Sequence, residues 1–163
     1  MIRPATDADL PRLTHIYNYY VVNSHVTFDL ETVTLEERRE WFSQFAPKGP
    51  HRLFVAEESG IVAGYAGSFR FRTRCAYEGT IETTVYCAPE AVGGGIGHAL
   101  YTALFEALRG EDLHVAIGAI AVPNEASVGF HERFGFVLAG VMHEVGFKFG
   151  RYWDVAWYEK RLP

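Results

Sequence analysis

Cysteine, basic clusters and long apolar runs are scarce in this 163-residue sequence, and each shortage excludes a class of protein. The two cysteines, Cys75 and Cys87, offer neither a disulfide framework nor the spacing of a metal site, so a reducing cytoplasm fits best. The histidines also lack metal-ligand spacing, and we expect no metal. No apolar stretch approaches the roughly 20 residues of a membrane span, and residues 1–4 do not begin a signal peptide. The net charge is −5 with no basic run, which argues against a nucleic-acid partner.

The bulk composition is that of a soluble globular enzyme. Hydrophobic residues make up 48% of the chain and charged residues 21%, far from the profile of a disordered protein. The length predicts one domain, residues 1–163. Capping signals, at residues 34–37 and at Asn124 among others, and a hairpin of residues 53–57 and 61–69 give the main boundaries. With the hydrophobic periodicity they predict the order strand, two helices, three strands, helix, strand, helix and two strands. That order predicts an α/β (α+β) fold in which helices cover a mixed sheet.

Two predicted strands flank the most distinctive part of the chain. Residues 80–87 alternate, with Ile81 and Thr83 on one face and Glu82 and Thr84 on the other. Residues 113–122 are almost wholly apolar, which predicts a central strand covered on both faces. Between the two strands, an apolar stripe over residues 96–108 predicts an amphipathic helix.

Four glycines lie among residues 93–97, between the alternating strand and that helix. Glycine allows a sharp turn and a close approach by another molecule, and the free N–H groups of the turn and of the helix start favour an anion. The segment lacks the Gly-Lys of a Walker loop, and His98 and Leu100 occupy the positions where a dinucleotide fingerprint needs its third glycine. We therefore interpret the segment as a binding turn for a phosphorylated cofactor. A glycine turn without a ligand is the alternative.

Glu82 and three polar residues near position 130 are candidates for chemistry. Glu82 lies in the middle of a largely apolar strand, where desolvation raises the pKa of a carboxyl and suits it to act as a general base. A glutamate on a solvated sheet face is the alternative. Asn124, Ser127 and His131 are spaced i, i+3 and i+7, so they share one helix face that lines a cleft or faces solvent.

A group of arginines follows the second strand of a predicted hairpin. Arg70, Arg72 and Arg74 alternate with other residues, so all three point to one side if the run is extended. Guanidinium groups beside Tyr77 suit a carboxylate or another small oxyanion. A solvated loop is the alternative.

These motifs together resemble the GNAT acetyltransferase superfamily, and within it the phosphinothricin and methionine sulfoximine N-acetyltransferases. The superfamily pattern is a strand, a glycine turn and a helix, followed by a second strand and an Asn-containing helix that ends in Gly-Phe. The closer resemblance runs from Ile2 to the C-terminus and rests on residues 18–20, 27–28, 76–77, 82–86, 100–102 and 146–150. It implies the GNAT fold, a mixed and mostly antiparallel central sheet with helices on both faces.

The resemblance also implies roles for individual residues. Glu82 matches the general base for the substrate amine, and His131 matches a position where this subfamily has histidine and many relatives have a tyrosine acid. The backbone of Val85, Tyr86 and Cys87 matches the segment that pairs with the acetyl-pantetheine arm of acetyl-CoA. The other positions that match the cofactor site are Gly93, Gly94, Gly95, Ile96, Gly97, His98, Asn124 and Ser127. The positions that match the substrate pocket are Phe28, Arg72, Arg74 and Tyr77.

One departure from the family pattern concerns the glycine turn. The family usually has Arg or Gln where this chain has Val92, and a basic residue where it has Gly94. The backbone amides of the turn do not depend on those side chains. The departure therefore bears on the affinity for the cofactor rather than on its identity.

The function implied by the resemblance is transfer of an acetyl group from acetyl-CoA to the α-amine of a small amino acid. Methionine sulfoximine, methionine sulfone and phosphinothricin are the implied acceptors, and the arginines support a partner that carries a carboxylate. A protein N-terminus, a polyamine or an aminoglycoside is the alternative acceptor, and a non-catalytic acyl-CoA sensor is the alternative outside enzymes. A homodimer is also expected of the family.

Overall fold

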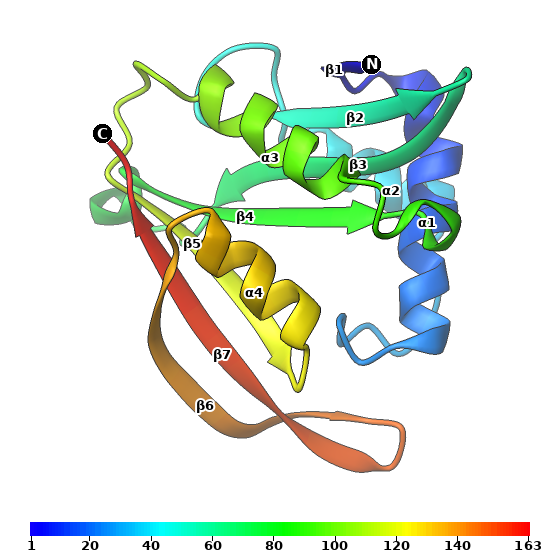
Figure 1. Cartoon of the computed structure of the whole chain (residues 1–163), viewed down its shortest axis with the longest axis vertical. Helices are drawn as coiled ribbons and strands as arrows, with labels where there is room; N and C mark the ends of the chain where they lie inside the picture. The colour runs from blue at the N-terminus through cyan, green and yellow to red at the C-terminus, as the bar shows by residue number, and fades with distance from the viewer.

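Seven strands form one mixed sheet in the computed structural model, which describes residues 1–163 (Figure 1). Across the sheet the order is β1-β2-β3-β4-β5-β7-β6, and every neighbouring pair is antiparallel except β4 and β5. The strands are β1 Ile2–Pro4, β2 Leu53–Glu58, β3 Ile61–Arg70, β4 Thr80–Cys87, β5 Val115–Val122, β6 Val137–Lys148 and β7 Arg151–Arg161. The helices are α1 Leu10–Asn23, α2 Leu35–Phe42, α3 Ile96–Ala107 and α4 Glu125–Arg133. The order of elements and the fold class predicted from the sequence are confirmed.

No helix combines the length and the apolar character needed to cross a membrane.

Several helices begin at local capping signals in the sequence. At the start of α2, the Glu37 amide donates to the Thr34 hydroxyl and the Thr34 amide donates to the Glu37 carboxylate. At the start of α4, the Ser127 amide donates to Oδ1 of Asn124. α3 follows Gly95, whose φ of +79° is a left-handed conformation that glycine adopts without a steric penalty, so the glycine turn is part of the helix start.

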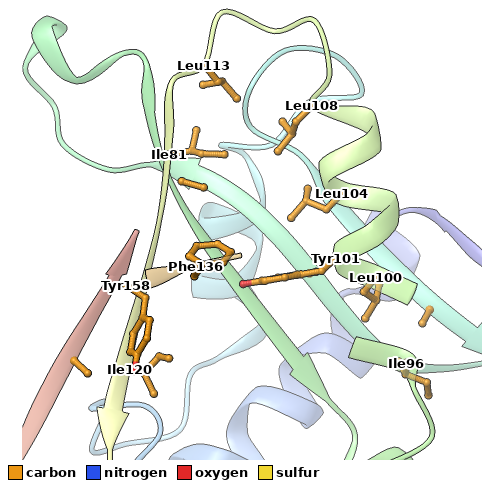
Figure 2. Close-up of a cluster of buried hydrophobic side chains, with 14 of the residues drawn as sticks. Ile81, Ile96, Leu100, Tyr101, Leu104, Leu108, Leu113, Ile120, Phe136 and Tyr158 are labelled. Carbon is orange, nitrogen blue, oxygen red and sulfur yellow. The ribbon is translucent and has the colours of Figure 1, made fainter. Parts of the chain in front are cut away.

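Helices cover both faces of the sheet, and each face has its own apolar core. In Figure 1, α3 and α4 lie in front of the sheet and α2 lies behind it. Beneath α3, Tyr101 is fully buried with Ile81 of β4 and with Phe136, toward which it points in Figure 2. On the other face, Leu13 of α1 packs in a second cluster with Tyr65 of β3. Both cores together fix β3 and β4 in the middle of the molecule.

β5 is buried on one face and partly open on the other, where Ala121 is buried but Ala119 is exposed. The prediction of a strand covered on both faces is therefore wrong for the middle of the strand. Ala116 and Ile120 pack into the core beneath α3, whereas Ile117 is half-buried and Ala119 is exposed on the opposite face. α1 reaches β3 and β4, and no helix covers this face of β5. An apolar run does not distinguish a covered face from one that lines a cavity with small residues.

β4 and β5 pair at one end and then diverge (Figure 1). Their parallel register consists of Thr80 with Val115, Ile81 with Ala116, and Glu82 with Ile117. Beyond Glu82, the edge of β4 that faces β5 has no strand partner. Backbone N–H and C=O groups need hydrogen-bond partners, so the opening between these strands is suited to a polar ligand.

β6 and β7 form a long hairpin that extends away from the rest of the sheet (Figure 1). Its far end is fastened to the segment between α1 and α2. The ring of Phe28 lies directly against Gly146, and His25 stacks on Trp153 with ring centroids 4.0 Å apart. The α1–α2 segment and the hairpin therefore hold each other in place.

Candidate active site

The opening between β4 and β5 continues as a cleft of about 790 Å³. It follows β4 from Thr83 to Cys87, passes the glycine turn and the start of α3, and is bounded by β5 and α4. The predicted cofactor residues that line it are Val85, Tyr86, Cys87, Gly93, Gly95, Ile96, Gly97, His98, Asn124 and Ser127. Gly94 is the one residue of that predicted set outside the lining.

The glycine turn forms a bare backbone surface in this cleft. Gly93 and Gly95 have left-handed φ angles of +88° and +79°, and a Cβ atom at either would find nothing within 4 Å. The backbone there is open to a ligand, and the unpaired N–H groups and positive dipole end of α3 begin at the next residue. Arg133 lines the cleft and adds a positive charge, and the His98 side chain lines it beside the start of α3. These features fit a pyrophosphate group.

His131 of α4 lies at the cleft but is only 5% exposed, and burial lowers the pKa of its imidazole. Nδ1 donates a hydrogen bond to the Ser127 carbonyl oxygen at 2.8 Å. Nε2 lies 3.2 Å from the Tyr101 hydroxyl, which in turn is 3.1 Å from Oγ1 of Thr83. A chain of polar contacts therefore connects α4, α3 and β4, with Nε2 as the nitrogen available for proton exchange.

Glu82 lies in a second cavity, of about 300 Å³, on the face of β4 opposite to Thr83. The side chain is half-buried. Burial raises the pKa of its carboxyl, and the positive charge of Arg72 opposes that effect to a smaller extent. A carboxylate in this state accepts a proton closer to neutral pH than a solvated one.

The cleft and the cavity share part of their lining. The residues common to both are Thr83, Thr84, Tyr86 and Ala119. Glu82 borders this junction from the face covered by α1 and α2, and His131 from the face covered by α3 and α4. Two molecules that enter from opposite faces of the sheet would therefore meet in the opening between β4 and β5, each beside one titratable group.

The predicted substrate residues Arg72, Arg74 and Tyr77 lie beyond the end of β3 and do not line either cavity. Arg72 is near enough to Glu82 for its charge to act on that carboxyl, and its guanidinium lies 4.3 Å from the centroid of the Phe71 ring. The Phe71 ring also contacts Tyr77, with centroids 5.7 Å apart. Arg74 is exposed and precedes a short 3-10 turn, Cys75–Tyr77. Arg72, Phe71 and Tyr77 therefore form a group beside Glu82, and Arg74 lies two residues from Arg72 along the chain.

Two other expectations from the sequence differ from the structure. β3 ends at Arg70 and residues 71–74 belong to no strand, so the alternation of the three arginines does not place them in one row. Arg70 instead lies near His51 and contributes to the lowered pKa of that imidazole. Phe28 packs on Gly146 of the hairpin, outside the lining of both cavities. Side-chain direction in both cases depends on turns that the sequence pattern did not reveal.

Two residues at the site were not among the predicted site residues, although each left a signal in the sequence. Tyr101 lies within residues 100–102, which help to carry the family resemblance, and it provides the hydroxyl between Thr83 and His131. Arg38 lies three residues after Leu35 on α2, which places a cation on the apolar face of that helix. Its side chain lines the same cavity as Glu82.

Comparison with known proteins gives consistent matches over nearly the whole chain. Residues 2–157 match the family described as acetyltransferase (GNAT) domain. A phosphinothricin N-acetyltransferase from Streptomyces coelicolor is 53% identical, over 99% of this chain and 95% of that protein. An L-methionine sulfoximine/L-methionine sulfone acetyltransferase from Pseudomonas aeruginosa is 38% identical, over 99% of this chain and 94% of that protein. The crystal structure of a GNAT superfamily phosphinothricin acetyltransferase from Sinorhizobium meliloti in complex with acetyl-CoA is similar with a TM-score of 0.92 and 35% identity, over 99% of this chain and 88% of that one.

Proposed function

Because the chain belongs to the acetyltransferase (GNAT) family and is an N-acetyltransferase, we propose that it transfers the acetyl group of acetyl-CoA to the α-amine of a small amino acid. The acceptors we propose are phosphinothricin, methionine sulfoximine and methionine sulfone, after the named activities of the Streptomyces and Pseudomonas relatives. The observation that carries the proposal is the junction of the two cavities. There a half-buried carboxylate on one face of the sheet meets a cleft with a phosphate-binding turn on the other.

Glu82 is the general base of the proposed mechanism. The acceptor amine arrives protonated, and the Glu82 carboxylate takes its proton directly or through one water. The neutral nitrogen bonds to the acetyl carbonyl carbon, and a backbone N–H in residues 85–87 stabilises the developing oxyanion. The carbon–sulfur bond then breaks, and the CoA thiolate takes a proton, for which His131 is the proposed donor. Because Nδ1 already donates to Ser127, Nε2 carries a proton only in the imidazolium form, and the ring returns to neutral imidazole in this step. No covalent intermediate with the enzyme is needed.

The chain fits acetyl-CoA, which supplies the activated acetyl group, at two places. The open backbone at Gly93 and Gly95 suits the pyrophosphate. The unpaired edge of β4 beyond Glu82 suits the amide groups of the pantetheine arm, which need both donors and acceptors. Val92 and Gly94 supply no charge, so the backbone amides of the turn provide the main contact with phosphate.

Replacing Arg74 by alanine is expected to raise KM for a carboxylate-bearing acceptor by about five- to tenfold and to leave KM for acetyl-CoA unchanged. We propose that Arg72 and Arg74 bind the acceptor carboxylate. Arg74 is exposed, so its truncation removes a charge without opening a hole in a core. Steady-state kinetics with each substrate varied in turn give both constants. Arg70→Ala is the matched control, because Arg70 is also exposed but lies near His51; equal rises in both constants for Arg74→Ala contradict the assignment.

We also propose that the protein is a homodimer. The support is a set of exposed apolar side chains along β6, namely Val137, Leu138, Val141, Met142 and Val145. Exposed apolar side chains gathered along one strand are typical of an interface between proteins. Analytical ultracentrifugation is expected to detect a species of twice the 18.3 kDa chain mass, and a monomer at every concentration would reject the dimer.

The experiment that tests the function is release of free thiol from acetyl-CoA in the presence of a panel of amines. The panel contains the three proposed acceptors, ordinary amino acids, spermidine, an aminoglycoside and a short peptide. Saturable turnover with the sulfur- and phosphorus-containing amino acids supports the proposal. Turnover only with the cationic amines or the peptide keeps the acetyltransferase and rejects the acceptor class. No turnover, with acetyl-CoA still bound, favours a non-catalytic acyl-CoA sensor.

A further inference from the structure

Arg38 of α2 is a buried cation without an acidic partner. The residue is 5% exposed, and no carboxylate forms an ion pair with it. Nη2 donates a hydrogen bond to the Tyr65 hydroxyl at 2.7 Å, whereas Nε is buried with no hydrogen-bond partner. Buried charges are normally paired and their donors satisfied, so this guanidinium requires an explanation.

Aromatic rings hold the guanidinium in place. Its central carbon lies 3.6 Å from the ring centroid of Trp41, 4.9 Å from that of Tyr17 and 5.2 Å from that of Tyr65. Contacts with ring faces stabilise the positive charge, but they leave the N–H donors in the guanidinium plane unused. An arginine stays protonated in a protein, so the site keeps both its charge and its spare donors.

The acidic residues of the same cavity are engaged elsewhere. The cavity is lined by Asp29 and Glu37 as well as by Glu82. Asp29 accepts a hydrogen bond from the Tyr17 hydroxyl at 2.6 Å, and Glu37 caps α2 through Thr34. The Glu82 carboxyl interacts with the positive charge of Arg72, which opposes the rise of its pKa by burial. None of the three carboxylates therefore neutralises Arg38.

Arg38 and Glu82 both line this cavity. Arg38 is bonded to Tyr65, which pairs with Tyr86 on β4. Glu82 lies on the same strand and the same face as Tyr86, four residues before it. Arg38 is thus the cation in the lining of the cavity, whereas Arg72 lies outside that lining but acts on Glu82.

We propose that Arg38 binds the oxygen-bearing group at the end of the acceptor's side chain, such as a phosphinate, a sulfone or a sulfoximine. The inference rests on the function proposed above and assigns its specificity. The amine then faces Glu82, the carboxylate binds Arg72 and Arg74, and the distal oxygens accept hydrogen bonds from the guanidinium of Arg38. The methylthio group of methionine offers no comparable acceptor. Arg38 is therefore the residue that selects amino acids with an oxidised or phosphinic side-chain terminus.

The first test compares two variants on three acceptors that share the same α-amine and α-carboxylate. Arg38→Met keeps an unbranched side chain of similar length, and Arg38→Lys keeps the charge. Arg38→Met is expected to raise KM about tenfold for phosphinothricin and methionine sulfone, less than threefold for methionine, and not at all for acetyl-CoA. Arg38→Lys is expected to retain part of the preference for phosphinothricin. Equal rises for all three acceptors overturn the inference.

The second test measures binding without turnover, by the fluorescence of Trp41, which contacts Arg38. With CoA in place of acetyl-CoA, phosphinothricin is expected to change the fluorescence saturably and methionine is not. The change is expected to disappear in Arg38→Met, and in Trp41→Phe as a control for the other tryptophans. Thermal denaturation shows whether each variant is folded. If Arg38→Met does not fold, Arg38→Lys takes its place in both tests.

The two tests separate this inference from the proposed function. If the wild type acetylates phosphinothricin but shows neither the fluorescence change nor a loss of preference in the Arg38 variants, the inference is overturned and the function stands. If phosphinothricin binds saturably through Arg38 but no panel member is acetylated, the function is overturned and the site stands. If neither binding nor acetylation occurs, both are overturned.

Discussion

A Glu82→Gln variant is expected to lose about 10²- to 10⁴-fold in kcat/KM between about pH 6 and pH 7, the usual contribution of a positioned general base. Glutamine keeps the shape of the side chain but cannot take the proton of the acceptor amine. At higher pH more of the amine is already neutral, so the deficit is expected to shrink. In the wild type, kcat/KM is expected to fall as the pH drops through the raised pKa of Glu82. A pH–rate profile of both proteins measures these effects.

Stability provides the control for that result. The pKa of Glu82 is raised by burial, so the folded state favours the protonated carboxyl, and its ionisation destabilises the fold as the pH rises through that pKa. Glu82→Gln removes this penalty, and its Tm at pH 7.5 is expected to equal or exceed that of the wild type. Glu78→Gln, at an exposed glutamate before the same strand, is expected to keep full activity. Near-normal rates in Glu82→Gln would remove Glu82 as the base.

Gly95→Val is expected to weaken acetyl-CoA binding by about 10- to 100-fold. Gly95 has a left-handed φ of +79°, and a β-branched residue there costs of order 1–3 kcal/mol. Relief of that strain turns the backbone and misdirects the amides at the start of α3. Since about 1.4 kcal/mol corresponds to a tenfold change in Kd, the expected loss follows from the strain. Isothermal titration calorimetry with acetyl-CoA measures it.

Gly94 offers a matched control in the same turn. Its φ lies outside the left-handed region, and a Cβ atom would meet the Ala91 carbonyl oxygen at 3.5 Å, an ordinary contact. Gly94→Val is therefore expected to change Kd less than threefold. If both valine variants bind acetyl-CoA equally well, the backbone of the turn does not hold the cofactor.

Local sequence signals were sufficient for most of the fold. Reciprocal capping by Thr34 and Glu37, the N-cap of Asn124 and the alternation of residues 80–87 are short-range patterns, and each lies where the pattern predicted. The partly open face of β5 was missed because its cause is not local. It depends on the divergence of β4 from β5 and on which strands α1 covers, and neither is encoded within residues 113–122.

The candidate site shows the same difference between features set by local sequence and features set by distant parts of the fold. Most of the positions predicted for the cofactor line one cleft because they follow one another along a strand, a turn and a helix start. The position of Phe28 depends on a contact with Gly146, more than a hundred residues away, and the direction of Arg70 depends on where β3 ends. Arg38 was overlooked because a charge in a short helix is normally solvated. Only the rings around it, from α1, α2 and β3, reveal that it is buried.

The sheet is continuous across β4 and β5 through only three residue pairs. A ligand that forms hydrogen bonds with the free edges of β4 and β5 beyond Glu82 takes the place of the missing hydrogen bonds between the two strands. Because such a ligand binds only the folded state, it stabilises that state by about 2.7 kcal/mol at 100 times its Kd. If acetyl-CoA is that ligand, as proposed above, the saturated protein is expected to resist proteolysis longer than the free protein.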